Sequence, residues 1–523
     1  MRYYLLLLFI GFSLCFTSCR DDFEFEHSTG SLEFSRDTVY LDTVFTNIGS
    51  STYTLKVYNR SDKDIKIPSI RLGEGEDSKY RLMVDGQPGK VFNDVELLAK
   101  DSMFVFIETT IDYNEYVNNE TTFLYNDKIY FDSGTNEQKV ELVTLVQDAV
   151  FIKPDKSLPD NIKEKLIISG EQTDIQGHEL TTPEELHWTN EKPYVVYGYA
   201  LIPNGQTLTI DAGARVHFHA ESGLIVDVTG ILNINGTLSA TEELENEVIF
   251  EGDRLEPEFS DVPGQWNNLW IFSGQDNTIN HLTLKNAVVG ILMDVLIDTR
   301  PRLTINNSQI YNCVNFGILA RHAILNGDNL VANKAGQASI ALTQGGNYNF
   351  RHCTFGNYFG GFNQVPVLIN DYQEISDGTI LVSDLDAGFD NCILYGSSNL
   401  GVSLEYKFPE QTLFKCEFTN CLIKVFDSSR QLKNNPLYPP EISDVNNPDL
   451  VAYTNCIIAK NSSTNKPDFL DPQNNMLNIG EDSAANGTAD AIIAQAVGPD
   501  ILGIARVAPY DMGAYESTPF VED

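Results

Sequence analysis

The strongest constraint on the fold is a short repeat, in which an apolar residue precedes an Asn and a small residue then precedes Ile. The Asn positions recur about every 21 to 26 residues, which fits one coil of a three-sheet parallel β-helix. Asn suits the corners of such coils because it tolerates left-handed backbone and can bond side chain to side chain in a ladder. The instances are Leu284…Asn286…Gly290-Ile291, Ile310…Asn312…Gly317-Ile318, Leu330…Asn333…Ser339-Ile340, and a weaker one at Asn357.

Short apolar strands with Gly at their corners extend this pattern toward the N-terminus. Residues 208–218, 223–228 and 230–237 are examples. Strands of this length with few helical stretches predict a solenoid over residues 166–516. Leucine-rich repeats have a similar period, but the Leu pattern that they require is absent.

Five cysteines stand at or near the start of an apolar run, so they occupy equivalent places on successive coils. This setting predicts buried free thiols and not a disulfide framework. If a disulfide did form, Cys416 and Cys421 would be the nearest pair. No cysteine or histidine spacing matches a metal site. The five are Cys313, Cys353, Cys392, Cys421 and Cys456.

Residues 31–149 predict a separate β-sandwich, because short half-buried strands alternate there with turn clusters. Two examples of such strands are residues 38–41 and 53–58. Residues 150–165, which contain Pro154 and Pro159, predict a connector. Residues 517–523 are expected to form a tail.

The chain is strongly acidic: its 523 residues carry 35 Lys and Arg against 73 Asp and Glu, a net charge of -38. Such a surface repels phosphate backbones, so we expect no nucleic acid partner. The simpler explanation is that the negative charge keeps an exposed protein soluble. The alternative is that some of the acidic groups bind cations.

The first residues predict a targeting segment. Arg2 precedes an apolar stretch over residues 3–16 that is short for a bilayer span, and Thr17-Ser18-Cys19 follows. This order resembles a bacterial lipobox, which implies a signal peptide over residues 1–18 and lipidation of Cys19. The acidic cluster after Cys19 resembles a surface-export signal, so residues 19–30 are expected to be a tether at the outer face of an outer membrane. An ordinary secretory signal with an incidental Cys is the alternative.

The end of the chain carries the most specific resemblance. Asp500-Ile501-Leu502-Gly503, Arg506 and Asp511-Met512-Gly513-Ala514-Tyr515-Glu516 resemble the C-terminal cap of secreted right-handed parallel β-helix proteins of the choice-of-anchor Q type. Within residues 31–149, a strand, an Asn-led turn at residues 59–62 and the run over residues 65–70 follow in an order that resembles immunoglobulin-like modules of the abnormal-spindle/hydin type. These resemblances imply an all-β chain, with a small β-sandwich before a right-handed parallel β-helix. They do not imply an activity, because the fold serves many functions.

Basic residues on the predicted coils are candidates for polysaccharide lyase chemistry. A lyase neutralises a substrate carboxylate with a cation or an Arg, and it needs a base nearby. Coil stacking could bring several of these side chains to one face, although scattered surface charges are the simpler explanation. The candidates are Arg321, His322, Arg351 and His352, with Arg300 and Arg302 beside them.

Asp384 and Asp386 are the candidates for hydrolase chemistry, which uses paired carboxylates. Strand alternation would place both on one face, and Asp390 follows them. A solvated turn is the simpler explanation. The run does not match an EF-hand loop, so calcium is only weakly indicated and no cofactor is expected.

Aromatic side chains are candidates for stacking on sugar rings. Trp266, Trp270 and Tyr358 are the main ones, and burial is the alternative explanation for each.

Together these features favour a cell-surface lipoprotein that presents its solenoid to a glycan or a surface protein, without catalysis. A polysaccharide lyase or glycoside hydrolase, and a structural component of a surface assembly, remain the alternatives.

Overall fold

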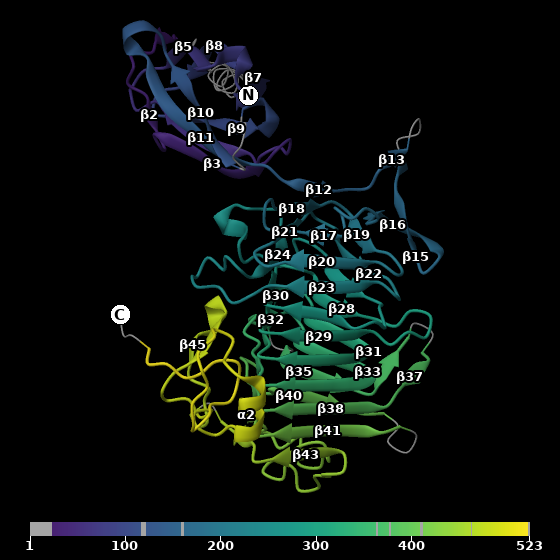
Figure 1. Cartoon of the computed structure of the whole chain (residues 1–523). Helices are drawn as coiled ribbons and strands as arrows, with labels where there is room; N and C mark the ends of the chain where they lie inside the picture. Colours follow the sequence, from purple (N-terminus) through teal and green to yellow (C-terminus); the bar gives the residue numbers. More distant parts are fainter. Residues whose placement is uncertain are drawn as a thin grey trace, which may run out of the picture. The chain divides into compact units, whose positions relative to one another are not determined.

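The computed structural model describes residues 24–116, 122–157, 162–361, 364–375, 378–407, 412–461 and 463–520. The predicted signal peptide and Cys19 lie outside these residues. The chain divides after Asp148 into two compact units, both drawn in Figure 1. Among the described residues, no helix is long and apolar enough to cross a membrane.

The first unit is a sandwich of two mainly antiparallel sheets. Its shared core forms because inward and outward side chains alternate along the strands, as on β4, where Leu55 and Val57 are buried and their neighbours are exposed or half-buried. One sheet consists of β1 (Glu26–His27), β5 (Ile65–Leu72), β10 (Thr122–Phe131), β11 (Gln138–Gln147), β3 (Thr38–Phe45) and β8 (Val91–Leu97). The other consists of β2 (Glu33–Phe34), β4 (Tyr53–Tyr58), β9 (Ser102–Thr109), β6 (Tyr80–Val84) and β7 (Gln87–Gly89).

The second unit is a parallel β-helix in which each coil contributes strands to three faces. On the first face lie β16 (Glu171–Glu179), β19 (Tyr199–Ile202), β22 (Gly223–Val226), β25 (Asn268–Ile271), β28 (Val289–Met293), β31 (Phe316–Asp328), β33 (Ala338–Arg351), β35 (Val365–Asn370) and β40 (Val402–Glu405). Because β31 and β33 are long, they continue onto the second face.

The second face also holds β17 (His187–Trp188), β20 (Thr207–Asp211), β23 (Ile231–Asn235), β26 (Asn277–Asn280), β29 (Arg302–Asn306), β38 (Leu385–Asp390), β41 (Phe414–Thr419) and β43 (Val451–Thr454). The third face holds β12 (Val150–Ile152), β18 (Tyr194–Val196), β21 (Arg215–Phe218), β24 (Val248–Gly252), β27 (Leu282–Lys285), β30 (Gln309–Cys313), β32 (Val331–Ala335), β34 (Thr354–Phe355), β39 (Ile393–Leu394), β42 (Leu422–Lys424) and β44 (Ile457–Ala459).

The predicted fold class, an all-β chain with a small sandwich before a parallel β-helix, is confirmed. Two details differ from the prediction. Glu26–His27 pair with β5, so the sandwich begins inside the expected tether. Val150–Ile152 pair with β18, so a strand of the solenoid stands where a connector was predicted.

The corners of the solenoid use Asn as the repeat predicted. Asn286 and Asn312 have φ of 68° and 58°, in the left-handed region. Their amides do not bond to one another in a ladder, however. Asn286 Nδ2 donates to the Ser260 carbonyl (2.8 Å), and Asn312 Nδ2 donates to Asp261 Oδ1 (2.8 Å). These two corner amides therefore hold loops outside the coils, whereas at another corner Asn329 Nδ2 donates to Asn307 Oδ1 of the preceding coil at 2.9 Å.

The C-terminal segment, residues 463–520, packs along the third face and not over the end of the solenoid. In Figure 1 it is the yellow part of the chain, beside β30 and β32. It contains β45 (Phe469–Asp471), β46 (Met476–Ile479) and α2 (Ala491–Val497). Its apolar side chains pack with outward side chains of the third face in two buried clusters, one that includes Tyr515 and Val331 and one that includes Met512 and Ile393.

The end of the core is instead closed by the loop over residues 427–450. Leu437 and Tyr438 are buried there, and Tyr438 Oη donates to the Val402 carbonyl at 3.4 Å. At the other end, Trp188 stacks on Tyr194 with ring centroids 4.9 Å apart. Aromatic side chains thus cover the apolar core at both ends of the solenoid.

The cysteines of the described residues are free thiols, as predicted, although Cys456 is half-buried and not fully buried. Cys353, Cys392 and Cys421 stack on successive coils, where the Cys353 N–H points to Cys392 Sγ and the Cys392 N–H to Cys421 Sγ, both at 3.4 Å. Cys416 and Cys421, the pair considered for a disulfide, are both free and buried. Burial raises the pKa of the Cys313 thiol to about 12, so this thiol stays protonated.

Residues of the closing motif form one buried network within the C-terminal segment. Arg506 Nη1 lies 3.0 Å from Glu516 Oε1, and the two side chains are 2% and 10% exposed. Arg506 Nη2 also donates to Asn329 Oδ1 (2.9 Å) on the corner before β32. Removing one partner of a buried pair leaves an uncompensated charge, which costs about 3–5 kcal/mol.

We therefore expect Arg506→Met to lower the free energy of unfolding by about 3–5 kcal/mol and to make residues 463–520 sensitive to protease. Urea unfolding and limited proteolysis measure the two effects. Arg60→Met is the matched control, because its pair with Glu33 is more than half exposed and should contribute little. Equal stability of the two variants would contradict the assigned role of Arg506.

Candidate functional site

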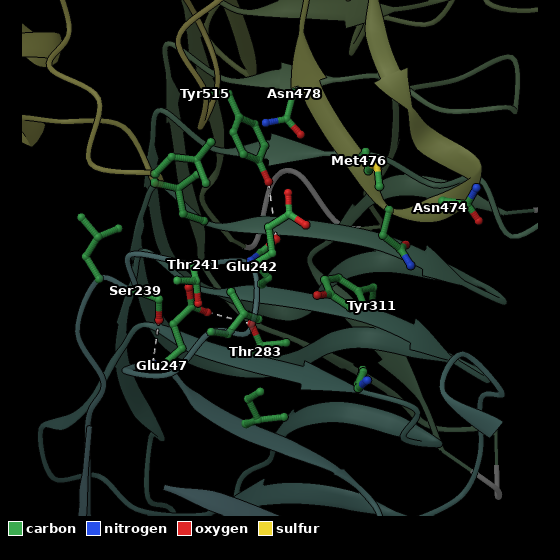
Figure 2. Close-up of a pocket in the computed structure, with 18 of the residues that line it drawn as sticks. Ser239, Thr241, Glu242, Glu247, Thr283, Tyr311, Asn474, Met476, Asn478 and Tyr515 are labelled. Carbon is green, nitrogen blue, oxygen red and sulfur yellow. Dashed lines mark hydrogen bonds between the residues drawn. The ribbon is translucent and has the colours of Figure 1, made fainter. Parts of the chain in front are cut away.

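The main candidate site is a cleft of about 670 Å³ on the third face of the solenoid, shown in Figure 2. Its floor is formed by outward side chains of β24, β27 and β30, including Thr283 and Tyr311. One wall is the loop over residues 238–247, and the opposite wall belongs to the C-terminal segment. Its size is in the range of small-ligand sites.

Glu247 is the buried carboxyl of the cleft. Its Oε2 accepts a hydrogen bond from Thr283 Oγ1 at 2.9 Å, drawn as a dashed line in Figure 2. Burial raises the pKa of Glu247 above its usual range, although the Thr283 hydrogen bond and the charge of Arg215 oppose this shift. A carboxyl of this kind can donate a proton at a higher pH than an exposed one.

Two tyrosines line the cleft, and they differ in exposure: Tyr311 is half-buried, whereas Tyr515 is 4% exposed. Tyr311 lies on the floor and Tyr515 on the opposite wall, where its hydroxyl donates to Gln309 Oε1 at 3.5 Å. Burial raises the pKa of both phenols, with Glu247 adding to the shift, so both remain neutral. The cleft therefore presents the ring and hydroxyl of Tyr311 to a ligand, whereas Tyr515 mainly closes the wall.

The charge of the cleft is negative. Its lining includes the carboxyl groups of Glu242, Glu247 and Asp261. Among the described lining residues, Lys285 is the single Lys or Arg, and its Nζ already lies 2.9 Å from Glu251 Oε2. An anionic ligand would thus meet several carboxyl groups and one cation that already has a partner.

Amide hydrogen bonds fix the wall that the C-terminal segment provides. Asn475 Nδ2 donates to Asn312 Oδ1 (3.3 Å), and Asn475 Oδ1 accepts from Asn333 Nδ2 (3.0 Å). Asn312 in turn donates to Asp261, another lining residue. The corner asparagines that the repeat revealed therefore position both the wall and a carboxylate of the cleft.

The predicted arginines lie elsewhere, each against a carboxylate. Arg321 Nη1 donates to Asp294 Oδ2 at 2.8 Å. Arg351 makes two hydrogen bonds to Asp328, of 2.7 and 2.5 Å, and these bonds raise its pKa. Such pairs fix the side chains on the surface of the solenoid.

The two predicted histidines do not join these arginines in one acid–base site. His322 lies on a corner with φ of 46°, and burial together with the charge of Arg300 lowers its pKa. Its Nδ1 is buried without a hydrogen-bond partner among the described residues. His352 is fully buried beneath the C-terminal segment, so it is a structural residue.

The predicted carboxylate pair also has structural contacts. Asp384 is exposed, and its Oδ1 accepts from the Leu413 N–H at 2.8 Å. Asp386 faces outward from β38, in register with Asn347 and Lys415 on the adjacent strands. Neither lines the cleft.

The predicted aromatic residues offer little surface for stacking on a sugar. Trp266 is 1% exposed and stacks on Phe218 with centroids 4.3 Å apart, so it is a core residue and not a binding platform. Trp270 is half-buried against Phe272. Tyr358 is half-buried, and its ring meets that of Phe469 edge-on in the C-terminal segment.

Within the described residues, one group could supply ligands to a metal ion. Asp155, Glu164 and His178 bring ligand atoms within 4.8 Å of one another. Carboxylates already occupy both ring nitrogens of His178, with Glu164 at 3.0 Å and Glu185 at 2.8 Å. These contacts stabilise the protonated ring and raise its pKa against the opposing effect of burial, which disfavours metal binding.

The cleft is not predicted by the sequence, although the repeat contains a usable signal. Lys285 and Tyr311 each come directly before a repeat Asn, Asn286 and Asn312. They pair in register on β27 and β30, so the repeat places both on the outer side of one corner. The opposite wall comes from a segment more than 150 residues later, which no local pattern indicates.

Comparisons with known proteins do not assign a family. No family model matches the chain, and no curated protein matches it. Solved structures that match include a family 123 glycoside hydrolase from Clostridium perfringens, with 10% identity and a TM-score of 0.15 over 22% of this chain and 26% of that chain. The E. coli chaperone DraB matches with 14% identity and a TM-score of 0.16, over 24% of this chain and 58% of that one.

A third matching structure is the catalytic domain of a GH87 alpha-1,3-glucanase in complex with tetrasaccharides. Its identity is 10% and its TM-score 0.20, over 72% of this chain and 88% of that chain. The first two matches thus span about a quarter and somewhat over half of the structures concerned. Likenesses at these TM-scores carry no argument about function.

His352 should remain neutral in the folded protein. Its Nδ1 donates to the Gly513 carbonyl (3.2 Å), and its Nε2 accepts from Asn391 Nδ2 (2.8 Å). Burial lowers its pKa to about 3, and the charge of Arg506 adds to the effect. Since the unfolded histidine has a pKa of about 6.5, the stability that neutral His352 contributes is complete above pH 6.5 and is lost as the pH falls toward 3.

Between pH 7 and pH 4 the wild type should therefore lose about 3 kcal/mol more stability than His352→Leu, which has no group to protonate there. Urea unfolding of both proteins at the two pH values measures this difference. The same pH dependence in both proteins, or an imidazole that titrates near pH 6.5 in an NMR experiment, would refute the assignment.

Proposed function

We propose that this protein is a cell-surface lipoprotein that binds a neutral or amino-bearing glycan in the cleft on the third face. The observation that carries the proposal is the lining, where phenol, hydroxyl, amide and carboxyl groups converge in one cavity. Sugar rings combine apolar C–H faces with hydroxyl edges, so they suit a site with rings and many hydrogen-bonding groups.

The charge of the lining supports the choice of glycan. Glu242 and Asp261 repel uronate and sulfate groups, and Lys285 is paired with Glu251. Polysaccharide lyases act next to a substrate carboxylate and need a cation to neutralise it. The charge of the cleft therefore favours neutral or positively charged sugars, and it disfavours the acidic substrates of a lyase.

Glycoside hydrolysis is the second candidate, because the raised pKa of Glu247 suits a general acid. Inverting and retaining hydrolases both need a second carboxylate. Asp261, which also lines the cleft, is the residue that would take this role. Glycan binding and glycan cleavage in the same cleft can be separated by one substitution at Glu247.

The position at the cell surface is the second part of the proposal, and it rests on the lipobox-like Thr17-Ser18-Cys19 and the acidic residues after it. Two or three acyl chains on Cys19 hold a protein firmly on a membrane. We expect labelled fatty acid to enter the wild type and not Cys19→Ser, and protease added to intact cells to degrade the protein. Labelling of Cys19→Ser would exclude this anchor, and protection from the protease would place the protein inside the cell envelope.

Binding in the cleft can be measured by calorimetry on the chain from Arg20 onward, with neutral, amino-bearing and uronate oligosaccharides. We expect Tyr311→Ala to weaken binding at least tenfold, because it removes both a ring and a hydroxyl from the floor. Glu242→Gln should weaken binding of the amino-bearing sugar several-fold. Glu243→Gln is its matched control, since Glu243 is the exposed neighbour of Glu242 that does not line the cleft.

Products are recorded in the same samples. New reducing ends that disappear in Glu247→Gln while binding persists would establish the hydrolase, whereas binding without products would establish the binding protein. Preferred binding of the uronate, or affinities that Tyr311→Ala leaves unchanged, would overturn the proposed site.

A further inference from the structure

The N-terminal sandwich has an unusual outer face on the sheet of β2, β4, β9, β6 and β7. Strand alternation normally places polar side chains there. Here Phe104, Phe106 and Met83 face outward and are 49%, 37% and 41% exposed. Phe106 and Met83 are register partners on β9 and β6, and the rings of Phe104 and Phe106 stack with centroids 6.3 Å apart. Together they form one continuous apolar patch.

A hollow of about 270 Å³ lies at one side of this patch. Phe106, Met83 and Pro88 form its apolar walls, and Arg81, Glu108 and Thr52 form its polar rim. Phe104 does not line it. The hollow is therefore amphipathic, with a ring on one side and hydrogen-bonding groups on the other.

The rim is held together by its own contacts. Thr52 Oγ1 donates to Glu108 Oε1 at 2.5 Å, and Arg81 Nη2 lies 3.7 Å from Glu108 Oε2. Arg81 Nη1 donates to Thr110 Oγ1 at 3.1 Å. A guanidinium has five N–H donors and a carboxylate accepts about four hydrogen bonds, so both groups retain capacity for a ligand.

We infer that the sandwich carries a second binding site, in which one neutral pyranose ring lies against Phe106 and its hydroxyls bond to Arg81 and Glu108. The C–H face of the sugar would cover the phenyl ring, and adjacent hydroxyls match the fork of the guanidinium and the carboxylate. The rim carries one charge of each sign, so it favours a ligand without net charge.

A protein strand is a poorer occupant of this region. The edge strand beside the hollow is β7, which has three residues and contains Pro88. Pro lacks an N–H donor, and short edge strands with Pro resist the addition of another strand. A purely apolar side chain would leave the capacity of Arg81 and Glu108 unused. The hydroxylated ring is the ligand that uses both sides of the hollow.

The test measures neutral oligosaccharides of glucose, mannose, galactose and N-acetylglucosamine on the chain from Arg20 onward, in a Tyr311→Ala background that disables the cleft of the solenoid. We expect binding to persist there, to fall at least tenfold in Phe106→Ala, and to fall several-fold in Glu108→Gln. Phe104→Ala is the matched control, because it removes a ring of the same patch that is more exposed than Phe106 and lies outside the hollow, and it should leave the affinity unchanged. Circular dichroism confirms that each variant is folded.

The proposal is overturned if none of these sugars binds in the Tyr311→Ala background, or if Phe104→Ala and Phe106→Ala weaken binding equally. It is also overturned if an apolar peptide competes more strongly than the sugar. Since the two sites are mutated separately, failure of the sandwich site leaves the proposal for the cleft intact, and failure of the cleft leaves the sandwich site open to its own result.

Discussion

Hydrogen bonds between corner amides and the C-terminal segment are the interaction on which this structure's cleft depends. Asn333, Asn391 and Asn420 donate to carbonyl groups of Pro472, Asp490 and Thr488, at 2.9, 3.0 and 2.9 Å. Parallel coils repeat these corners at nearly constant spacing, so the corners offer a column of amides to a chain that runs across them. The apolar contacts of Tyr515 and Met512 then exclude water from the same interface.

The sequence contained enough to predict the coils, because their signals are local and periodic. The Asn repeat and the cysteines each mark the same position on successive coils. In the structure Cys353, Cys392 and Cys421 lie above one another in this way. Boundaries were less well predicted: β12 is three residues long and resembles a connector until its pairing with β18 is known.

The candidate site was missed for a different reason. Arg321 and His352 were predicted as site residues because basic residues are few in this chain. The sequence does not show which acidic or polar groups lie beside them. In the structure Arg321 faces Asp294 and His352 faces a carbonyl and an amide, so both stabilise the fold. Glu247 is one of many acidic residues, and only its burial beside Thr283 distinguishes it. Burial depends on how distant segments meet, which periodicity cannot supply.

The route of the C-terminal segment has a consequence for how the site is assembled. The Tyr515 hydroxyl bonds to Gln309, and the Pro499 carbonyl accepts from Asn329, so this later segment completes a surface whose floor is made some 200 residues earlier. Coils can stack one after another as the chain emerges, because each coil contacts its neighbours. The cleft, in contrast, depends on contacts between residues far apart in the sequence, so it can form only after the solenoid has folded. A chain that stops before residue 463 would therefore have a nearly complete scaffold without the cleft, because one wall of the cleft would be missing.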